Sequence, residues 1–274
     1  MNAIIVPVDF SPVSLNAVHY ATKLALAKGA SLVLLNTYQI PLTMSEVPVA
    51  TVTVEELSEI SRLRLAELKT SLEHTTSRTI KFYTESRLGD VVGALEELCG
   101  SLQPSAVVMG TTGHGQMHDF FVGSNTSEAM KRLVYPLIVV PPGAVFKTPK
   151  NIGLACDMEG VVDNLPSDKI HELVRWFDSN LFVLNVRPVG EVMGVDMNTE
   201  SLFADTLLAD LKPSYSFLTG EEVSDGLQTF AEKQNLDWLI LIPKKHRGFS
   251  GFLKRSVSKQ LAYQTHIPVV CIHA

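Results

Sequence analysis

Cysteine, positive charge and long apolar runs are all scarce in this sequence of 274 residues. The three cysteines, Cys99, Cys156 and Cys271, form no C-x-x-C motif and no evenly spaced set. This pattern excludes a disulfide-stapled scaffold and a cysteine-rich zinc site, and it favours small buried thiols in a reducing compartment. The formal net charge is −6, which disfavours generic DNA or RNA binding because such proteins contact the phosphate backbone through a basic surface.

No segment offers the ~20 consecutive apolar residues that a membrane helix needs. The apolar run at residues 3–6 ends at Pro7, and no basic segment precedes it, so we do not expect it to act as a signal peptide. Apolar residues make up 46% of the chain, a share that lets each of roughly two domains build a core. We expect a cytoplasmic protein with neither a nucleic acid nor a membrane as its partner.

Short β-rich runs alternate with helix-like segments in the first part of the chain. The predicted strands are residues 4–8, 31–36, 80–84, 106–109 and 137–140, and the predicted helices are residues 12–28, 54–72, 90–98 and 124–133. Strands that alternate with helices favour a parallel sheet with helices on both faces. The continuous apolar run at residues 137–140 is typical of such a sheet, since both faces of its strands are buried.

The chain then repeats this organisation. The cluster of breakers from Pro141 to Pro149 predicts a boundary, which gives an N-terminal repeat at residues 1–145 and a C-terminal repeat at residues 150–274. The second set of predicted strands is 152–156, 181–186, 215–218, 238–242 and 268–272, and the second set of helices is 167–177, 199–211, 223–233 and 256–263. A shift of 132 residues places His114 on His246 and Ser124 on Ser256, which supports two copies of one fold.

A glycine motif carries the chemistry of the N-terminal repeat. Gly110, Gly113 and Gly115 follow the fourth predicted strand, and Gly123 precedes the next predicted helix. Glycines let several backbone N–H groups turn toward one anion, and a helix N-terminus adds further unpaired N–H groups. The hydroxyls of Ser124 and Thr126 are additional donors. The motif therefore predicts a phosphate site, and a glycine-rich turn that binds nothing is the alternative.

Three predicted strands end at positions that suit a ligand. Asp9, Thr37 and Gly110 follow the first, second and fourth strands, and ligands of open parallel sheets lie beyond the carboxyl ends of the strands. Asp9 can accept hydrogen bonds from ribose hydroxyls or from an adenine amino group. The alternative role of Asp9 is to cap the following helix beside Ser11.

The segment from Ile5 to Ser11, joined to the Gly-x2-Gly-x9-Gly-Ser spacing, resembles the universal stress protein family over nearly the whole chain, as a tandem of two such domains. For the nucleotide-binding branch this resemblance implies ATP on a flavodoxin-like, Rossmann-like α/β fold with five parallel strands in the order 3-2-1-4-5. It implies that Pro7 and Asp9 contact the adenosine and that the Thr37 backbone meets the adenine edge. The rest of the predicted nucleotide-binding set is Val8, Met109 and Gly110 near the nucleoside, and Gly113, His114, Gly115, Gly123, Ser124, Asn125 and Thr126 around the phosphates. The resemblance leaves the role of His114 open.

The C-terminal repeat departs from this pattern. Ile242, Lys245 and Arg255 replace Gly110, Gly113 and Gly123 under the same shift, although Asp157 still matches Asp9. Side chains then occupy positions where backbone would touch phosphate, so we expect no ATP in this repeat. The basic residues near this loop form either a separate anion site or a solvated surface; they are Lys244, Lys245, Arg247, Lys254 and Arg255.

Three functions remain open from the sequence. The favoured one is a regulatory or stress-response protein that binds ATP, AMP or ADP, with Mg²⁺ or Mn²⁺ carried by the phosphates. The alternatives are a slow ATP hydrolase and a scaffold for a ligand other than a nucleotide. No residue is predicted as catalytic or as a protein ligand of a metal, because His114, His118 and Asp119 lack an evident fourth partner.

The last strand of each repeat would form a sheet edge, and exposed edges invite pairing. Members of the family that the chain resembles commonly dimerise through this strand. We therefore expect the two repeats to dock within the chain as a pseudo-dimer, with a homodimer and an unidentified protein partner as further assemblies.

Overall fold

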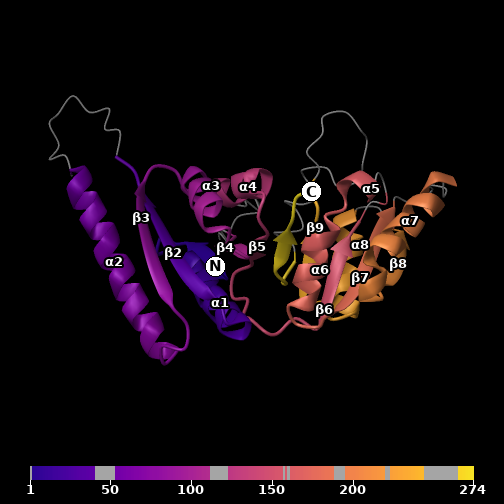
Figure 1. Ribbon diagram of the computed structural model, residues 1–274, viewed down its shortest axis with the longest axis horizontal. Coiled ribbons are helices and arrows are strands. Elements are labelled where there is room, and N and C mark those ends of the chain that lie inside the picture. Colours follow the sequence, from indigo (N-terminus) through magenta and orange to yellow (C-terminus); the bar gives the residue numbers. More distant parts are fainter. Residues whose placement is uncertain are drawn as a thin grey trace. The chain divides into compact units, whose positions relative to one another are not determined.

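The computed structural model describes residues 2–40, 53–111, 123–156, 158, 161–187, 195–219, 223–243 and 265–274. Contacts divide the chain into two compact units, an N-terminal unit at residues 1–109 and a C-terminal unit at residues 110–274. Figure 1 shows the strands and helices along the sequence. The predicted boundary between the repeats stays a prediction.

The strands form a mixed sheet in the order β3-β2-β1-β4-β5-β10-β9-β6-β7-β8. Their bounds are β1 (Ala3–Pro7), β2 (Ser31–Tyr38), β3 (Phe82–Leu88), β4 (Ala106–Gly110), β5 (Leu137–Val140), β6 (Asn151–Ala155), β7 (Asn180–Arg187), β8 (Ser214–Thr219), β9 (Trp238–Leu241) and β10 (Val269–Cys271). Within each repeat the order is 3-2-1-4-5, which confirms the predicted α/β topology.

The N-terminal unit is built around β1, which pairs in parallel with β2 on one side and β4 on the other. Ile4, Ile5 and Val6 are fully buried, as expected for a strand covered on both faces. Its helices are α1 (Pro12–Lys28), α2 (Val54–Thr75) and α3 (Val91–Leu102). After β3 the chain crosses back over β2 and β1 to add β4 on the other side of β1, in parallel with it. Because parallel crossovers are right-handed, this change in the direction of strand addition places α3 on the face opposite α1 and α2.

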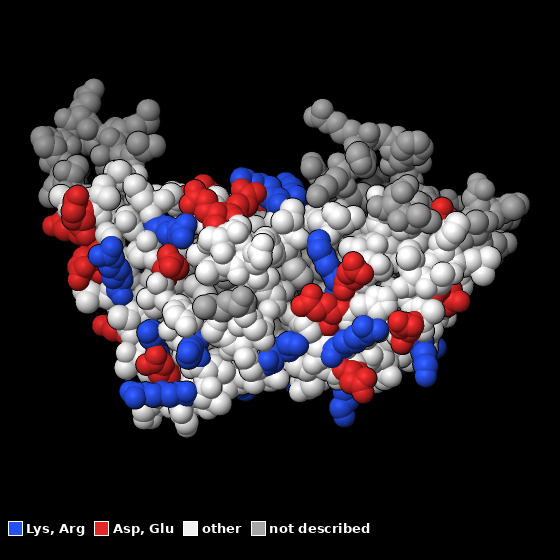
Figure 2. Space-filling model, viewed as in Figure 1, with Lys and Arg blue, Asp and Glu red and all other residues white. Residues whose placement is uncertain are grey.

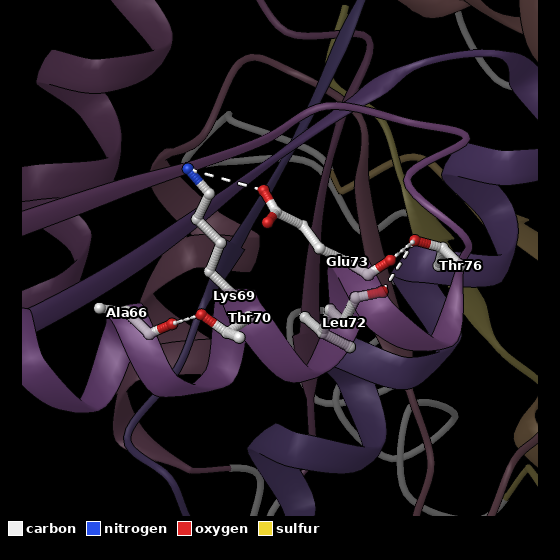
Figure 3. A network of polar contacts seen from close by, with 6 residues as sticks. All are labelled: Ala66, Lys69, Thr70, Leu72, Glu73 and Thr76. Atoms are coloured by element: carbon white, nitrogen blue, oxygen red, sulfur yellow. Dashed lines mark hydrogen bonds and ion pairs between the residues drawn. The ribbon is translucent and has the colours of Figure 1, made fainter.

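Local signals fix the ends of these helices. Ser11 caps α1 by accepting a hydrogen bond from the Ser14 N–H at 3.2 Å, and Gly29 ends the helix at φ +60°. Thr53 and Glu56 form a capping box at the start of α2. At the other end of α2 the Thr76 hydroxyl donates to the Leu72 carbonyl at 2.7 Å (Figure 3).

The C-terminal unit begins with α4 and continues through the second set of elements. Its helices are α4 (Ser124–Arg132), α5 (Val161–Asn164), α6 (Ser167–Arg175), α7 (Val195–Leu208), a 3₁₀ turn (Ala209–Leu211) and α8 (Val223–Lys233). Trp238 on β9 is fully buried. Its ring lies edge-on to Trp176 and Phe177, with centroids 6.4 and 6.0 Å away, so an aromatic cluster anchors this core.

The last strands of the two repeats pair with each other, as the sequence predicts. Val139 of β5 lies opposite Val269 of β10, and Leu137 lies opposite Cys271, in antiparallel register. The pairing covers an edge that each repeat would otherwise expose.

Several local predictions differ from the structure. The helix predicted at residues 199–211 begins at Val195 and ends at Leu208, where a 3₁₀ turn follows. The third strand spans Phe82–Leu88 rather than residues 80–84, because its backbone pairs with β2 as far as Tyr38, although no side chain after Phe82 is fully buried and residues 84–87 are polar. The short helix α5 was not expected from the sequence. The predicted helix at residues 256–263 lies outside the described residues.

Among the described residues, none of the helices combines the length and the apolar character required to cross a bilayer.

The three cysteines are buried as free thiols. Burial raises the pKa of Cys271 to about 12, and burial with the nearby charge of Glu96 raises the pKa of Cys99 to about 12. Because the thiolate is the reactive form, we expect both thiols to resist iodoacetamide at pH 8 in the folded protein and to react once urea unfolds it. Mass spectrometry of digested protein measures this, and rapid labelling of either residue in the native state would contradict it.

Candidate functional site

The turn after β1 carries three predicted site residues, Pro7, Val8 and Asp9. The Val8 N–H donates to the Leu35 carbonyl of β2 at 2.8 Å, and the Val8 side chain is buried. Asp9 is exposed beyond it. The N-terminal unit therefore fixes the backbone on one side of Asp9 and leaves the carboxylate at the surface.

Asp9 also performs the capping role that the sequence offered as its alternative. Its Oδ1 accepts the Ser11 N–H at 2.9 Å, one residue before α1 begins. Burial raises the pKa of Asp9, but hydrogen bonds from Ser11 and Ser14 lower it by more, so this pKa lies below its ordinary value. The carboxylate is therefore ionised at neutral pH. A second acceptor role toward a ligand is compatible with this geometry, since a carboxylate has two oxygens and about four lone-pair sites.

Phe10 shapes the same turn. It adopts φ +63°, a left-handed conformation that is uncommon for a bulky residue. The Arg64 guanidinium of α2 lies 4.0 Å from the centre of the Phe10 ring, a cation–π geometry that favours this placement. The matching residue of the C-terminal repeat, Met158, also has a positive φ of 54°, so both repeats use this turn after their first strand.

A buried polar network that no sequence pattern indicated holds the turn in place. The Asn36 side chain on β2 donates from Nδ2 to the Val8 carbonyl at 2.6 Å, and its Oδ1 accepts from the Ser61 hydroxyl of α2 at 2.7 Å. Ser61 in turn accepts from the Ser86 hydroxyl of β3 at 2.7 Å. The available signal was a single amide residue directly after four apolar residues in the strand.

Replacing Asn36 with alanine is expected to lower the free energy of unfolding by about 1–3 kcal/mol, because the Val8 carbonyl and the Ser61 hydroxyl lose their buried partner. Urea denaturation measures the change. Asn36→Asp is the matched comparison, since it keeps the acceptor for Ser61 but removes the donor to Val8. A midpoint unchanged by Asn36→Ala would contradict this role.

Thr37 and Met109 lie at the same edge of the sheet in the N-terminal unit. Thr37 is the penultimate residue of β2 and pairs with Arg87 of β3. The register of β4 against β1 places Val107 opposite Ile5, so Met109 lies level with Pro7. The carboxyl ends of these strands therefore meet at one edge, as predicted.

The C-terminal unit shows how α4 is attached to the strand before it. The Thr126 hydroxyl donates to the Gly110 carbonyl at 3.0 Å, and Thr126 is buried. Ser124 and Asn125 are exposed, and the N-cap residue of the helix, Gly123, has no side chain with which to cap it. Thr126 thus fixes the first turn of α4 against the end of β4, while its neighbours face solvent.

The predicted loop residues Gly113, His114 and Gly115 lie outside the described residues, as do His118 and Asp119.

The C-terminal repeat keeps the backbone contacts of the turn after its first strand, but the side chains around this turn differ. Cys156 donates from its N–H to the Leu184 carbonyl at 2.9 Å, and the Asn185 amide donates to the Cys156 carbonyl at 3.0 Å. These contacts match those of Val8 and Asn36. Met158, however, is buried, and a Glu200 oxygen accepts the Val161 N–H at the start of α5 at 2.7 Å.

The structure describes only some of the residues that the sequence singled out in the C-terminal repeat. Asp157, Ser256 and the five basic residues of the C-terminal loop lie outside the described residues, whereas Ile242 is half-buried at the end of β9.

Charges on the described surface are mixed. Figure 2 shows Lys and Arg interspersed with Asp and Glu, without a continuous basic area on the described part of that face. Among the described residues, His, Cys, Asp and Glu form no group of three that could hold a metal ion.

The model of the Universal stress protein family matches residues 1–141, more than half of the chain. The chain belongs to the universal stress protein family.

Solved structures agree with the tandem fold. A universal stress protein from Archaeoglobus fulgidus DSM 4304 is 16% identical and has a TM-score of 0.74, with 99% of this chain and 98% of that chain covered. A putative universal stress protein from Pseudomonas aeruginosa UCBPP-PA14 is 12% identical, with a TM-score of 0.64 and coverage of 99% and 93%. At these identities the likeness shows the fold alone.

A universal stress protein from Archaeoglobus fulgidus was solved in complex with dAMP. It is 15% identical and has a TM-score of 0.34, and the match covers 46% of this chain and 99% of that chain. No curated protein matches the sequence significantly.

Proposed function

We propose that this universal stress protein binds an adenine nucleotide, ATP, AMP or ADP, with its N-terminal repeat and acts as a regulatory protein in a stress response. The observation that carries the proposal is the start of α4. Ser124 and Asn125 are exposed in the first turn of α4, and the N-cap residue of this helix, Gly123, has no side chain with which to cap it. Such a terminus presents backbone N–H groups and a partial positive charge to an anion.

The Thr126 contact supports this use of the helix. The Thr126 hydroxyl donates its hydrogen bond to the Gly110 carbonyl. Thr126 therefore positions the first turn of α4 and does not donate to a phosphate. Ser124 and Asn125 are left as the exposed polar side chains beside the N–H groups. The glycine motif of the sequence supplies further backbone donors without requiring a basic residue.

Asp9 supports recognition of the nucleoside. Its depressed pKa keeps the carboxylate charged, so it acts as a strong acceptor for ribose hydroxyls or an adenine amino group. Because the Asn36 network fixes the preceding backbone, the carboxylate is held in place before a ligand arrives. Mg²⁺ or Mn²⁺ would enter with the phosphates.

The described part of the C-terminal repeat differs from this arrangement around its first turn. The Glu200 carboxylate already occupies the N-terminus of α5, where it would repel an anion, and Met158 is buried at the position of the half-buried Phe10. Ile242, Lys245 and Arg255 replace the three motif glycines, and they add side chains at positions where backbone would contact a phosphate. We therefore propose one nucleotide per chain, held by the N-terminal repeat.

Isothermal titration of the full chain with ATP in the presence of Mg²⁺ tests the proposal. Saturable binding of one ATP per chain is the expected result. Two sites per chain would contradict the assignment to one repeat. Absence of heat at millimolar ATP, together with protein that carries no nucleotide in native mass spectrometry, would refute nucleotide binding.

A further inference from the structure

We propose that Lys169 and His273, both in the C-terminal repeat, position helix α4 and thereby raise its affinity for the phosphates of the bound nucleotide. The inference rests on the proposed function, because it assigns a role to the repeat that binds no nucleotide. It concerns contacts within the C-terminal unit.

The first contact is made by Lys169 of α6. Its ammonium group donates to the Val134 carbonyl at 3.2 Å and to the His273 carbonyl at 2.6 Å. Val134 follows the end of α4 in the N-terminal repeat, whereas His273 follows β10 in the C-terminal repeat. One cation thus joins the carbonyls of two segments that are far apart in sequence.

The second contact is made by His273, which is only 2% exposed. Its Nε2 lies 2.9 Å from the Met130 carbonyl. Since a carbonyl oxygen can only accept, Nε2 carries the proton in this contact. The antiparallel pairing of Cys271 with Leu137 holds the backbone near His273 against β5.

These contacts fall on the end of α4 opposite the proposed phosphate site. Met130 is within the last turn of α4, where carbonyls lack partners inside the helix. A histidine donor satisfies one of them, and the positive charge of Lys169 lies near the negative end of the helix dipole. At the other end, Thr126 ties the helix to Gly110.

Helix α4 has nine residues, so its two ends lie roughly 13 Å apart. A displacement of the C-terminal end therefore tilts the N–H groups at the N-terminal end. The C-terminal repeat acts as a brace that fixes the direction of these N–H groups before phosphate binds.

Substitution of Lys169 tests the brace in the full chain. Lys169→Met is expected to weaken ATP binding about two- to fivefold, the scale of a charge near a helix terminus. Adenosine has no phosphates, so its affinity should stay unchanged. Lys169→Arg should restore ATP binding. Lys150→Met, which removes an exposed cation elsewhere in the C-terminal repeat, is the control and should bind ATP like the wild type.

Hydrogen exchange provides a readout without a ligand. Lys169→Met should lower the protection of backbone amides in residues 127–133, as should His273→Phe, whereas His273→Gln keeps a donor near Nε2 and should preserve it. Unchanged protection in both Lys169→Met and His273→Phe would overturn the brace, whether or not the protein binds ATP. Equal weakening of ATP and adenosine in Lys169→Met would also overturn it, because that result indicates general destabilisation. A wild type that binds no ATP would refute the proposed function and the effect on phosphate affinity, whereas loss of protection in the variants would still support the positioning of α4 by Lys169 and His273.

Discussion

Replacing Asp9 with alanine is expected to lower the affinity for ATP about 10- to 150-fold, which corresponds to the ~1.5–3 kcal/mol of a hydrogen bond to a charged group. The carboxylate is exposed at the end of β1 and ionised at neutral pH. Alanine removes the acceptor but leaves the Asn36 contact to the Val8 carbonyl intact. Titration calorimetry with ATP and with adenosine measures the loss, and both ligands should be affected.

The C-terminal repeat offers a matched control for this experiment. Asp157 occupies the position of Asp9 in the other repeat, so Asp157→Ala should leave ATP affinity unchanged. Asp9→Asn separates charge from shape, since it keeps an acceptor oxygen and should lose less affinity than alanine. If Asp9→Ala binds ATP like the wild type, or if Asp157→Ala loses as much affinity, the placement of the nucleotide is wrong.

The lowered pKa of Asp9 also determines how this residue affects the dependence of stability on pH. A carboxyl whose pKa is lower in the folded than in the unfolded protein stabilises the fold above its unfolded pKa, and this contribution is lost as pH falls through the folded pKa. Asp9 therefore contributes no pH dependence between about pH 5 and pH 8. Thermal melts of wild type and Asp9→Asn over that interval should keep a constant separation.

Replacing Trp238 with alanine should lower the free energy of unfolding by about 3–5 kcal/mol, the usual cost of emptying a large buried aromatic site. Trp238 is fully buried, and it packs edge-on against Trp176 and Phe177. Both neighbouring rings would lose contacts with Trp238. Urea denaturation followed by circular dichroism measures the change.

Trp176 provides the comparison for this core. It is half-buried, so Trp176→Ala removes the same side chain from a site that keeps more solvent contact and should cost less. A smaller loss for Trp238→Ala than for Trp176→Ala would contradict the assignment of Trp238 as the centre of the cluster.

Residues close together in the sequence allowed most of the elements to be predicted. Ser11 and Pro12 mark the start of α1, and Gly29 marks its end; each acts through the backbone of its own turn. The third strand was misplaced because its edge position exposes polar side chains, and the apolar pattern on which the prediction relied is absent there. The strand order was correct in both repeats, but it came from the family resemblance, not from the periodicity.

The candidate site also contains residues that local sequence patterns predict and residues that they do not. Asp9, Thr37 and Gly110 were predicted from their places at the ends of strands, because parallel strands bring their carboxyl ends to one edge, whereas Met109 came from the family resemblance. Their contacts with a nucleotide stay a prediction. The Asn36–Ser61–Ser86 network was missed because no spacing rule links these three residues, which come from β2, α2 and β3. Only the packing of α2 over the strands brings their polar atoms within 3 Å.

The sequence by itself determined the alternation of strands and helices, the duplication, and the glycine motif that one repeat keeps and the other has lost. These features are local, since each depends on residues within one turn, one strand or one loop. The tertiary structure decided which polar groups satisfy one another across the fold, including Lys169 and His273 at the end of α4. Such contacts join residues 35 to 143 positions apart, and a buried carbonyl takes as its donor whichever polar group the packing brings nearest.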